Sequence, residues 1–134
     1  MSRVIFYKTQ PPGRAMLLPG ARNSMNSEIS YMEIGAGDAA GARAFMGELF
    51  GWDFHPIGAG PEGWFQTPSM KAGLHGNDPS PGILVFFGVP GLEAAIAKVR
   101  LLGGEASEPS DEPGFGRFSM CRSPQGIQFG LHSQ

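Results

Sequence analysis

The chain has one cysteine and no long apolar run, and each shortage excludes a class of protein. Cys121 has no second cysteine to pair with, so an internal disulfide cannot form. The longest unbroken apolar run, residues 83–87, is far shorter than the roughly 20 residues that a membrane-spanning helix needs. The expectation is therefore a cytoplasmic protein with no membrane partner.

The chain also lacks a large excess of charge of one sign. Its 10 Lys and Arg residues and 12 Asp and Glu residues give a formal net charge of −2. Without a basic patch or a long charged run, there is no electrostatic basis for binding nucleic acid or an anionic membrane surface. The length of 134 residues predicts a single domain that buries roughly 70% of the surface of its unfolded chain.

The first 27 residues lack acidic residues altogether. They contain four basic residues, but proline and glycine break them at residues 11–13 and 19–20, which argues against a continuous amphipathic targeting helix. We interpret residues 1–27 as an N-terminal extension. Two alternatives remain for it: residues 3–8 add a strand to the domain, or the segment packs on a neighbouring molecule.

Residues 38–52 carry the pattern of one amphipathic helix with both ends marked. Asp38 is suited to the N-cap and Gly51 to the C-terminal stop. Extended segments at 29–35 and 52–57 flank this helix, which predicts the crossover of a βαβ unit packed on a sheet. Its apolar stripe follows the spacing i, i+3, i+4 and i+7 and consists of Ala42, Phe45, Met46 and Leu49.

The same pattern returns 53 residues later, where Tyr31 corresponds to Leu84 and Gly51 to Gly104. The second helix is predicted at residues 91–104. The remaining strands are predicted at 63–67, 71–75, 83–89, 105–108, 115–121 and 127–132. Residues 28–78 and 80–132 therefore form two tandem βαβββ modules, and the fold class is α+β.

Residues 29–132 resemble the vicinal oxygen chelate superfamily, which includes glyoxalase I, extradiol dioxygenases and bleomycin-resistance proteins. The resemblance is carried by the segments YMEIGAGD, ELFGW, LLGG and PGFGRFSMCRSPQGIQFGL. It implies one glyoxalase-like domain at residues 28–134, in which two modules curl into an incomplete barrel around a cavity. It also implies a homodimer, and leaves open whether the modules pair within one chain or across two.

Catalytic members of this superfamily hold a divalent metal through His, Glu or Gln side chains on the strands. The resemblance places three of the four ligand positions on Tyr31, Leu84 and Gly130. Leu84 and Gly130 carry no donor atom, and Tyr31 is not a usual ligand. The fourth position is left open between Lys71 and His75. The resemblance therefore implies a member depleted of metal ligands, with no cofactor.

Strand alternation assigns the remaining candidates to faces of the sheet. Glu33 shares a face with Tyr31, and Gln128 shares a face with Gly130. Glu33 has two interpretations: a general base or ligand anchor, or a structural carboxylate that accepts hydrogen bonds from the backbone or Tyr31. We favour the structural one. The candidate ligand-binding residues are Tyr31, Glu33, Trp64, Phe86 and Gln128, with Trp64 at the rim of the cavity.

Two classes of function follow. The first is a metal-independent protein that binds a mostly apolar or aromatic small molecule, in the manner of bleomycin-resistance proteins that sequester a drug. The second is a lyase, isomerase or dioxygenase that uses Glu33, either without a metal or with ligands relocated to Glu33, His75 and His132. We interpret the three histidines as exposed or edge-strand residues and Cys121 as a small core residue. The loss of metal donors alongside retained aromatic residues favours the binding protein.

Overall fold

The computed structural model describes residues 25–133, so the predicted extension at residues 1–27 lies almost entirely outside the described part. The predicted helices and strands are present, and apart from 105–108 the strands match within one residue at each end. The elements are β1 (Ile29–Gly35), α1 (Ala39–Phe50), β2 (Asp53–Pro56), β3 (Gly63–Gln66), β4 (Lys71–His75), β5 (Gly82–Val89), α2 (Leu92–Leu101), β6 (Glu105–Ala106), β7 (Ser110–Glu112), β8 (Gly116–Arg122) and β9 (Gln128–Ser133).

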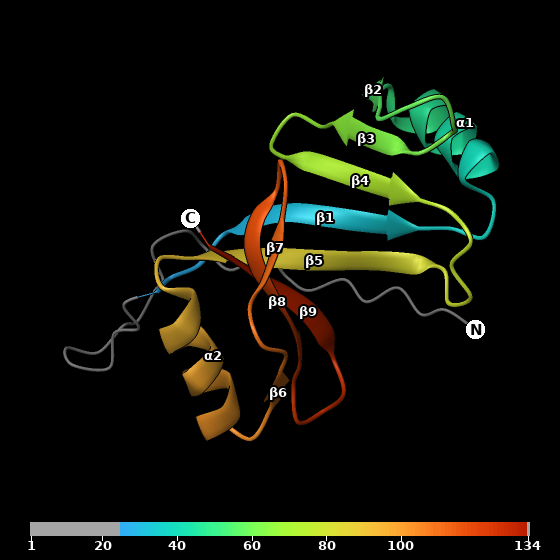
Figure 1. The fold of residues 1–134 in the computed structure, drawn as a ribbon. Coiled ribbons are helices and arrows are strands. Elements are labelled where there is room, and N and C mark those ends of the chain that lie inside the picture. Colours follow the sequence, from blue (N-terminus) through green and yellow to red (C-terminus); the bar gives the residue numbers. More distant parts are fainter. Residues whose placement is uncertain (1–24, 134) are drawn as a thin grey trace, which may run out of the picture.

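The strands form one mixed sheet in the order β2-β3-β4-β1-β5-β9-β8-β6, with β7 paired to β8 (Figure 1). Each module contains a parallel pair, β1 with β4 and β5 with β9. The modules meet where β1 runs antiparallel to β5 within one chain. In Figure 1, β8 and β9 cross the direction of β4, β1 and β5 steeply, so the sheet curls into an open half-barrel. The predicted α+β fold of two βαβββ modules is confirmed.

Each helix covers part of the outer face of this sheet with its own hydrophobic core. Under α1 the core includes Phe65 and Leu74, and under α2 it includes Leu131 and Cys121. Cys121 is buried there, as predicted. The inner face of the curled sheet is therefore left for other contacts. No helix in the described residues is long and apolar enough to span a membrane.

Helix α1 has its predicted ends but not its predicted face. Asp38 Oδ1 accepts a hydrogen bond from the Gly41 amide at 3.0 Å, and Gly51 closes the helix in the left-handed conformation at φ 71°. However, the core-facing side chains are Ala39, Ala42 and Met46. Phe45 and Leu49 are 63% and 58% exposed, so their assignment to the buried stripe was wrong. The stripe has helical periodicity, but periodicity does not fix the rotation at which the helix meets the sheet.

Of the strand predicted at residues 105–108, only Glu105 and Ala106 form a strand, β6. A strand that was not predicted, β7, follows at Ser110–Glu112, and both pair with β8. Pro109 stands between them and has no amide hydrogen for the ladder, so the pairing cannot continue through it. Strand β7 then turns back into β8 through residues 113–115. This hairpin places residue 115 against the inner face of the sheet.

Candidate functional site

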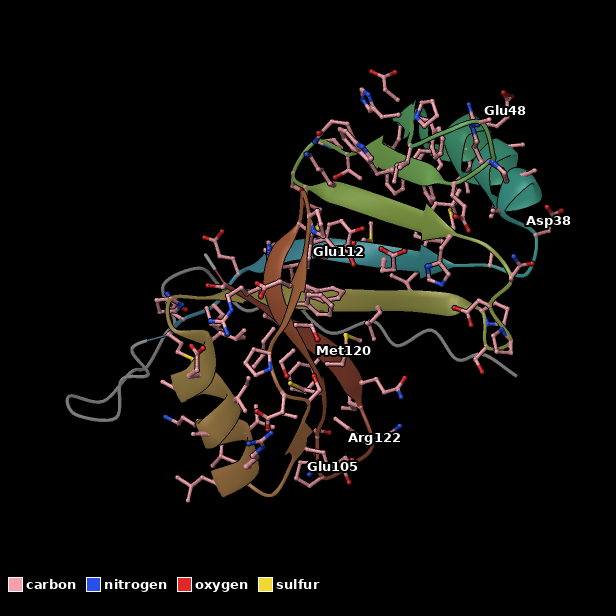
Figure 2. All side chains as sticks on the ribbon, viewed as in Figure 1. Asp38, Glu48, Glu105, Glu112, Met120 and Arg122 are labelled. Atoms are coloured by element: carbon pink, nitrogen blue, oxygen red, sulfur yellow. The ribbon has the colours of Figure 1, made fainter. Side chains whose placement is uncertain are left out.

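A cavity of about 730 Å³ lies on the inner face between the two modules. Figure 2 shows Met120 and Arg122 on β8 and Glu105 on β6, on the second module's side of this cavity. The first module contributes residues of β1, β4 and the loop after β4. The lining residues that carry the chemistry are Glu33, His75, Asp78, Leu84, Met120 and Gln128.

The strand register puts four of the five predicted ligand-binding residues on one face of the neighbouring strands β1, β5 and β9. Tyr31 lies opposite Phe86, which in turn lies opposite Gly130 on β9. Glu33 follows Tyr31, and Gln128 precedes Gly130, by two residues each, so all share this face. Glu33 and Gln128 line the open cavity. Tyr31 and Phe86 lie beyond its end, so their part in ligand binding stays a prediction.

Trp64 lies further away along the sheet, although it is on the same face. It pairs with Gly73 across β3 and β4, and its ring stacks on His55 at 4.1 Å between centroids. The Lys71 ammonium lies 4.4 Å from the centroid of the Trp64 ring. These neighbours hold Trp64 outside the lining of the cavity, and its predicted contact with a ligand at the rim remains untested.

A chain of four hydrogen-bonded side chains begins beyond the end of the cavity and continues along its wall. The Tyr31 hydroxyl donates to Glu33 Oε1 at 2.6 Å, and His75 Nδ1 lies 2.6 Å from Glu33 Oε2. On its other side, His75 Nε2 lies 2.9 Å from Asp78 Oδ2. An imidazole with a carboxylate oxygen at each nitrogen satisfies both as the imidazolium, which donates from both. The wall therefore presents one cation held between two carboxylates.

The ionisation of these groups follows from their contacts. The hydrogen bond with Glu33, and then that with Asp78, raises the pKa of His75 above its ordinary value. The Ser80 amide, followed by His75, lowers the pKa of Asp78. Burial, helped by the Glu33 carboxylate, raises the pKa of Tyr31 far above its usual range, so its phenol stays protonated.

Sequence reasoning missed this role of His75, which it took for an exposed or edge-strand residue. Strand β4 lies between β3 and β1 in the interior of the sheet, and His75 pairs with Gly35 on β1. Alternation along β4 is the signal that was available, because His75 is two residues after Gly73, the partner of Glu33. Asp78 lies in the loop after β4, where no periodicity applies.

Under the resemblance to the superfamily, the register also indicates which residue would stand at the fourth metal-ligand position. Glu33 and Phe86 correspond at the 53-residue offset, and their partners on the parallel strands β4 and β9 are Gly73 and Gly130. The fourth position is therefore Gly73, which has no donor. A Cβ at Gly73 would overlap the Tyr31 hydroxyl and the Glu33 carboxylate, and one at Gly130 would overlap the Phe86 ring.

The residues present do not fit a divalent metal. In the described part of the chain, no group of three or more His, Cys, Asp or Glu side chains is arranged to hold one. The relocated ligand set is only partly assembled, because Glu33 contacts His75 but His132 is engaged elsewhere. His132 Nε2 bonds the Phe115 carbonyl oxygen at 2.6 Å, and its Nδ1 lies 3.3 Å from the Ser30 hydroxyl.

Comparison with known proteins supports the fold. No protein-family model matches the sequence, and no curated protein matches it. Among solved structures, a hypothetical protein from Bacillus halodurans matches with a TM-score of 0.67 and 13% identity, over 81% of this chain and 95% of that one. Methylmalonyl-CoA epimerase from Mycobacterium tuberculosis matches with a TM-score of 0.64 and 14% identity, over 81% of this chain and 88% of that one. Homoprotocatechuate 2,3-dioxygenase from Brevibacterium fuscum matches with a TM-score of 0.63 and 15% identity, over 82% of this chain and 37% of that one.

Proposed function

From the premise that this chain has the fold of the vicinal oxygen chelate superfamily, we propose that it binds a small molecule in the inner cavity without a metal. One observation carries the proposal: at the four positions where the resemblance would put metal ligands, the chain has Tyr31, Gly73, Leu84 and Gly130, and the last three have no donor side chain. The space beside both glycines is already filled by neighbouring side chains. The cavity beside these positions remains, so binding is retained where metal chemistry is not.

The lining of the cavity indicates the kind of ligand. Leu84, Ile83 and Met120 supply apolar surface, whereas Glu33 and Gln128 supply hydrogen-bonding groups. Such a site suits a mostly apolar, planar molecule that carries a few polar groups. Each Glu33 oxygen already accepts one hydrogen bond and keeps a second lone pair, so Glu33 can anchor a donor on the ligand. Sequestration, as in bleomycin-resistance proteins, is the function that fits best.

The second candidate is a metal-free lyase or isomerase, and the Glu33–His75–Asp78 chain in the cavity wall is the observation that favours it. A general base must be free to accept a proton from the substrate. Here both oxygens of Glu33 accept hydrogen bonds, and both nitrogens of His75 lie against carboxylates. Taking up a proton would weaken the two short hydrogen bonds that the Glu33 carboxylate accepts, so we place binding ahead of catalysis.

Binding is tested with a panel of planar aromatic compounds, screened by ligand-observed NMR against the wild-type protein and Leu84→Trp. The larger ring should fill the cavity and weaken binding of any hit by about tenfold or more. Lys98→Ala, a change on the far side of α2, is the control and should leave affinity unchanged. If the compounds bound the wild type and Leu84→Trp with equal affinity, the cavity would not be their binding site.

The absence of a bound metal is tested by a separate measurement. Elemental analysis after dialysis should find no stoichiometric transition metal in the purified protein. A metal-to-protein ratio near one that is lost in Glu33→Ala would refute metal independence and support the enzyme. Conversion of a bound compound to product, abolished in the same variant, would support the metal-free lyase or isomerase.

A further inference from the structure

Phe115, at the tip of the β7–β8 hairpin, is surrounded by four aromatic rings. Its ring centroid lies 4.7 Å from Tyr31, 5.3 Å from Phe86 and 5.6 Å from Phe118. It also stacks on His132 at 4.0 Å with an angle of 8° between the planes. We call these four residues the aromatic cage. A single loop residue therefore fills a site built from β1, β5, β8 and β9.

The aromatic cage continues the same surface that lines the cavity. On three strands, a cage residue lies two positions from a lining residue and so points to the same side of the sheet. These pairs are Tyr31 with Glu33 on β1, Phe86 with Leu84 on β5, and Phe118 with Met120 on β8. The Tyr31–Glu33 hydrogen bond also links the two regions directly. The aromatic cage therefore adjoins the cavity on the same face of the sheet.

The strand that leads to Phe115 lies at the edge of the fold. Strand β7 pairs with β8 off the main path of the sheet, and its three residues are exposed. Gly114 and Gly116 flank Phe115 with φ angles of 84° and 112°, in the left-handed region that favours glycine. Figure 1 shows this hairpin reaching across β1. Withdrawing its tip would break the ring contacts of Phe115 and the His132 hydrogen bond while β8 stays in the sheet.

We propose that the aromatic cage is a subsite for one phenyl-sized ring of the ligand, which Phe115 fills in this structure and vacates when the ligand binds. The ligand's ring would replace the Phe115 ring among the same four partners, so the exchange leaves their aromatic contacts intact. The rest of the ligand would extend into the cavity toward Glu33 and Gln128. This inference rests on the proposed function and narrows the ligand to a molecule that ends in an aromatic ring.

The test uses toluene as the probe, because it matches the size and polarity of the Phe115 side chain. In the wild-type protein, saturating toluene should shift the side-chain NMR signals of Tyr31, Phe86 and Phe118. It should also abolish the nuclear Overhauser contacts between Phe115 and His132. Phe115→Ala should bind toluene about tenfold more tightly or better, since no internal ring competes for the subsite. Phe115→Leu should lie between the two, and it serves as the variant if the alanine protein does not fold.

Phe129→Ala is the matched control. Its ring packs on Phe87 at 6.0 Å on the outer face, so the change removes the same group away from the aromatic cage and should leave toluene affinity unchanged. Persisting Phe115–His132 contacts at saturation, or no toluene binding by the wild type, would overturn the inference. Shifts confined to Leu84 and Met120 would overturn it as well but support the cavity. The proposed function fails separately, when Leu84→Trp binds panel compounds as well as the wild type.

Discussion

Two glycines on the inner face, Gly73 and Gly130, determine how the residues around them pack. Each lies beside a larger residue on the neighbouring strand, Glu33 in the first module and Phe86 in the second. Because glycine has no side chain, the Tyr31–Glu33 pair closes over Gly73, and the Phe86 ring closes over Gly130. A hydrogen-bonded pair in one module and an aromatic ring in the other thus fill the space beside these two glycines.

This packing predicts that Gly130→Ala is destabilising. A Cβ at this position would overlap the Phe86 ring, and overpacking of this kind costs about 1–3 kcal/mol of unfolding free energy. Gly82, at the start of β5 on the same face, has no heavy atom within 4 Å of a Cβ built on it. Gly82→Ala should therefore change stability by no more than about 0.5 kcal/mol. Urea denaturation measures both, and similar losses in the two variants would contradict the packing of Phe86 on Gly130.

The His75 contacts predict a pH dependence with a definite sign. Hydrogen bonds to Glu33 and Asp78 raise the folded-state pKa of His75 above its ordinary value of 6.5. Its contribution to stability is therefore complete below about pH 6.5 and is lost as the pH rises through the folded-state pKa. The contribution of Asp78 depends on pH in the opposite direction. Because its pKa is lowered, Asp78 adds stability above pH 3.8, its ordinary pKa, and this stability is lost as the pH falls through the folded-state pKa.

His75→Gln, which does not ionise, isolates the first of these effects. The loss of stability relative to wild type should be larger at about pH 6 than at about pH 9, while Asp78 stays ionised throughout this window. Urea denaturation at both pH values is the measurement. A stability difference that does not change between them would show that His75 is not held as the imidazolium. With a side chain that is 41% exposed, we expect a modest effect.

Alternation along predicted strands was sufficient to place Tyr31, Glu33, Phe86 and Gln128 on one face. It could not find Phe115, because that residue lies in a turn and reaches Tyr31 from a distant part of the chain. The position of a turn residue depends on the path of the hairpin, and the first strand of this hairpin, β7, was not predicted. The cavity-facing residues on strands were therefore predictable, and those on loops were not.

At the scale of elements, the sequence signals for the two ends of helix α1 were correct, whereas the apolar stripe predicted its buried face only in part. Asp38 and Gly51 act through hydrogen bonds to their own helix, so local sequence determines them. The buried face of α1 depends instead on how the helix lies across a twisted sheet. Ala42 and Met46 reach the core while Phe45 points to solvent, and only tertiary packing separates these alternatives.

The N-cap of α1 gives a prediction at this scale. Asp38, at the start of α1 in Figure 2, accepts the Gly41 amide, and Asp38→Ala removes that acceptor. Loss of such a cap costs about 1 kcal/mol, within a range of about 0.5–2 kcal/mol. Asp38→Asn keeps an acceptor oxygen and should retain most of the stability. Thermal unfolding of the wild type and the two variants measures these changes in stability. Equal melting temperatures for Asp38→Ala and the wild type would rule out a stabilising cap.

At the scale of the whole molecule, the βαβββ repeat could be read from the sequence, but the way the modules join could not. The offset of 53 residues reveals the duplication, and it is equally compatible with pairing within one chain or across two. The structure joins them through β1 and β5 of the same chain, with Glu33 opposite Leu84 at the seam. The cavity is therefore formed within a single protomer.

The homodimer stays a prediction, and the exposed apolar side chains of α1 are where we expect its interface. Phe45, Leu49 and Phe50 are large and exposed on one helix, and burying such residues is a common source of dimer stability. Sedimentation at micromolar concentration should give a mass of about 28 kDa, twice the chain mass of 14.2 kDa. Leu49→Glu should dissociate the dimer, whereas Leu101→Glu, on the exposed end of α2, should not. A wild-type monomer would contradict the dimer, and a dimer that survives Leu49→Glu would place its interface away from α1.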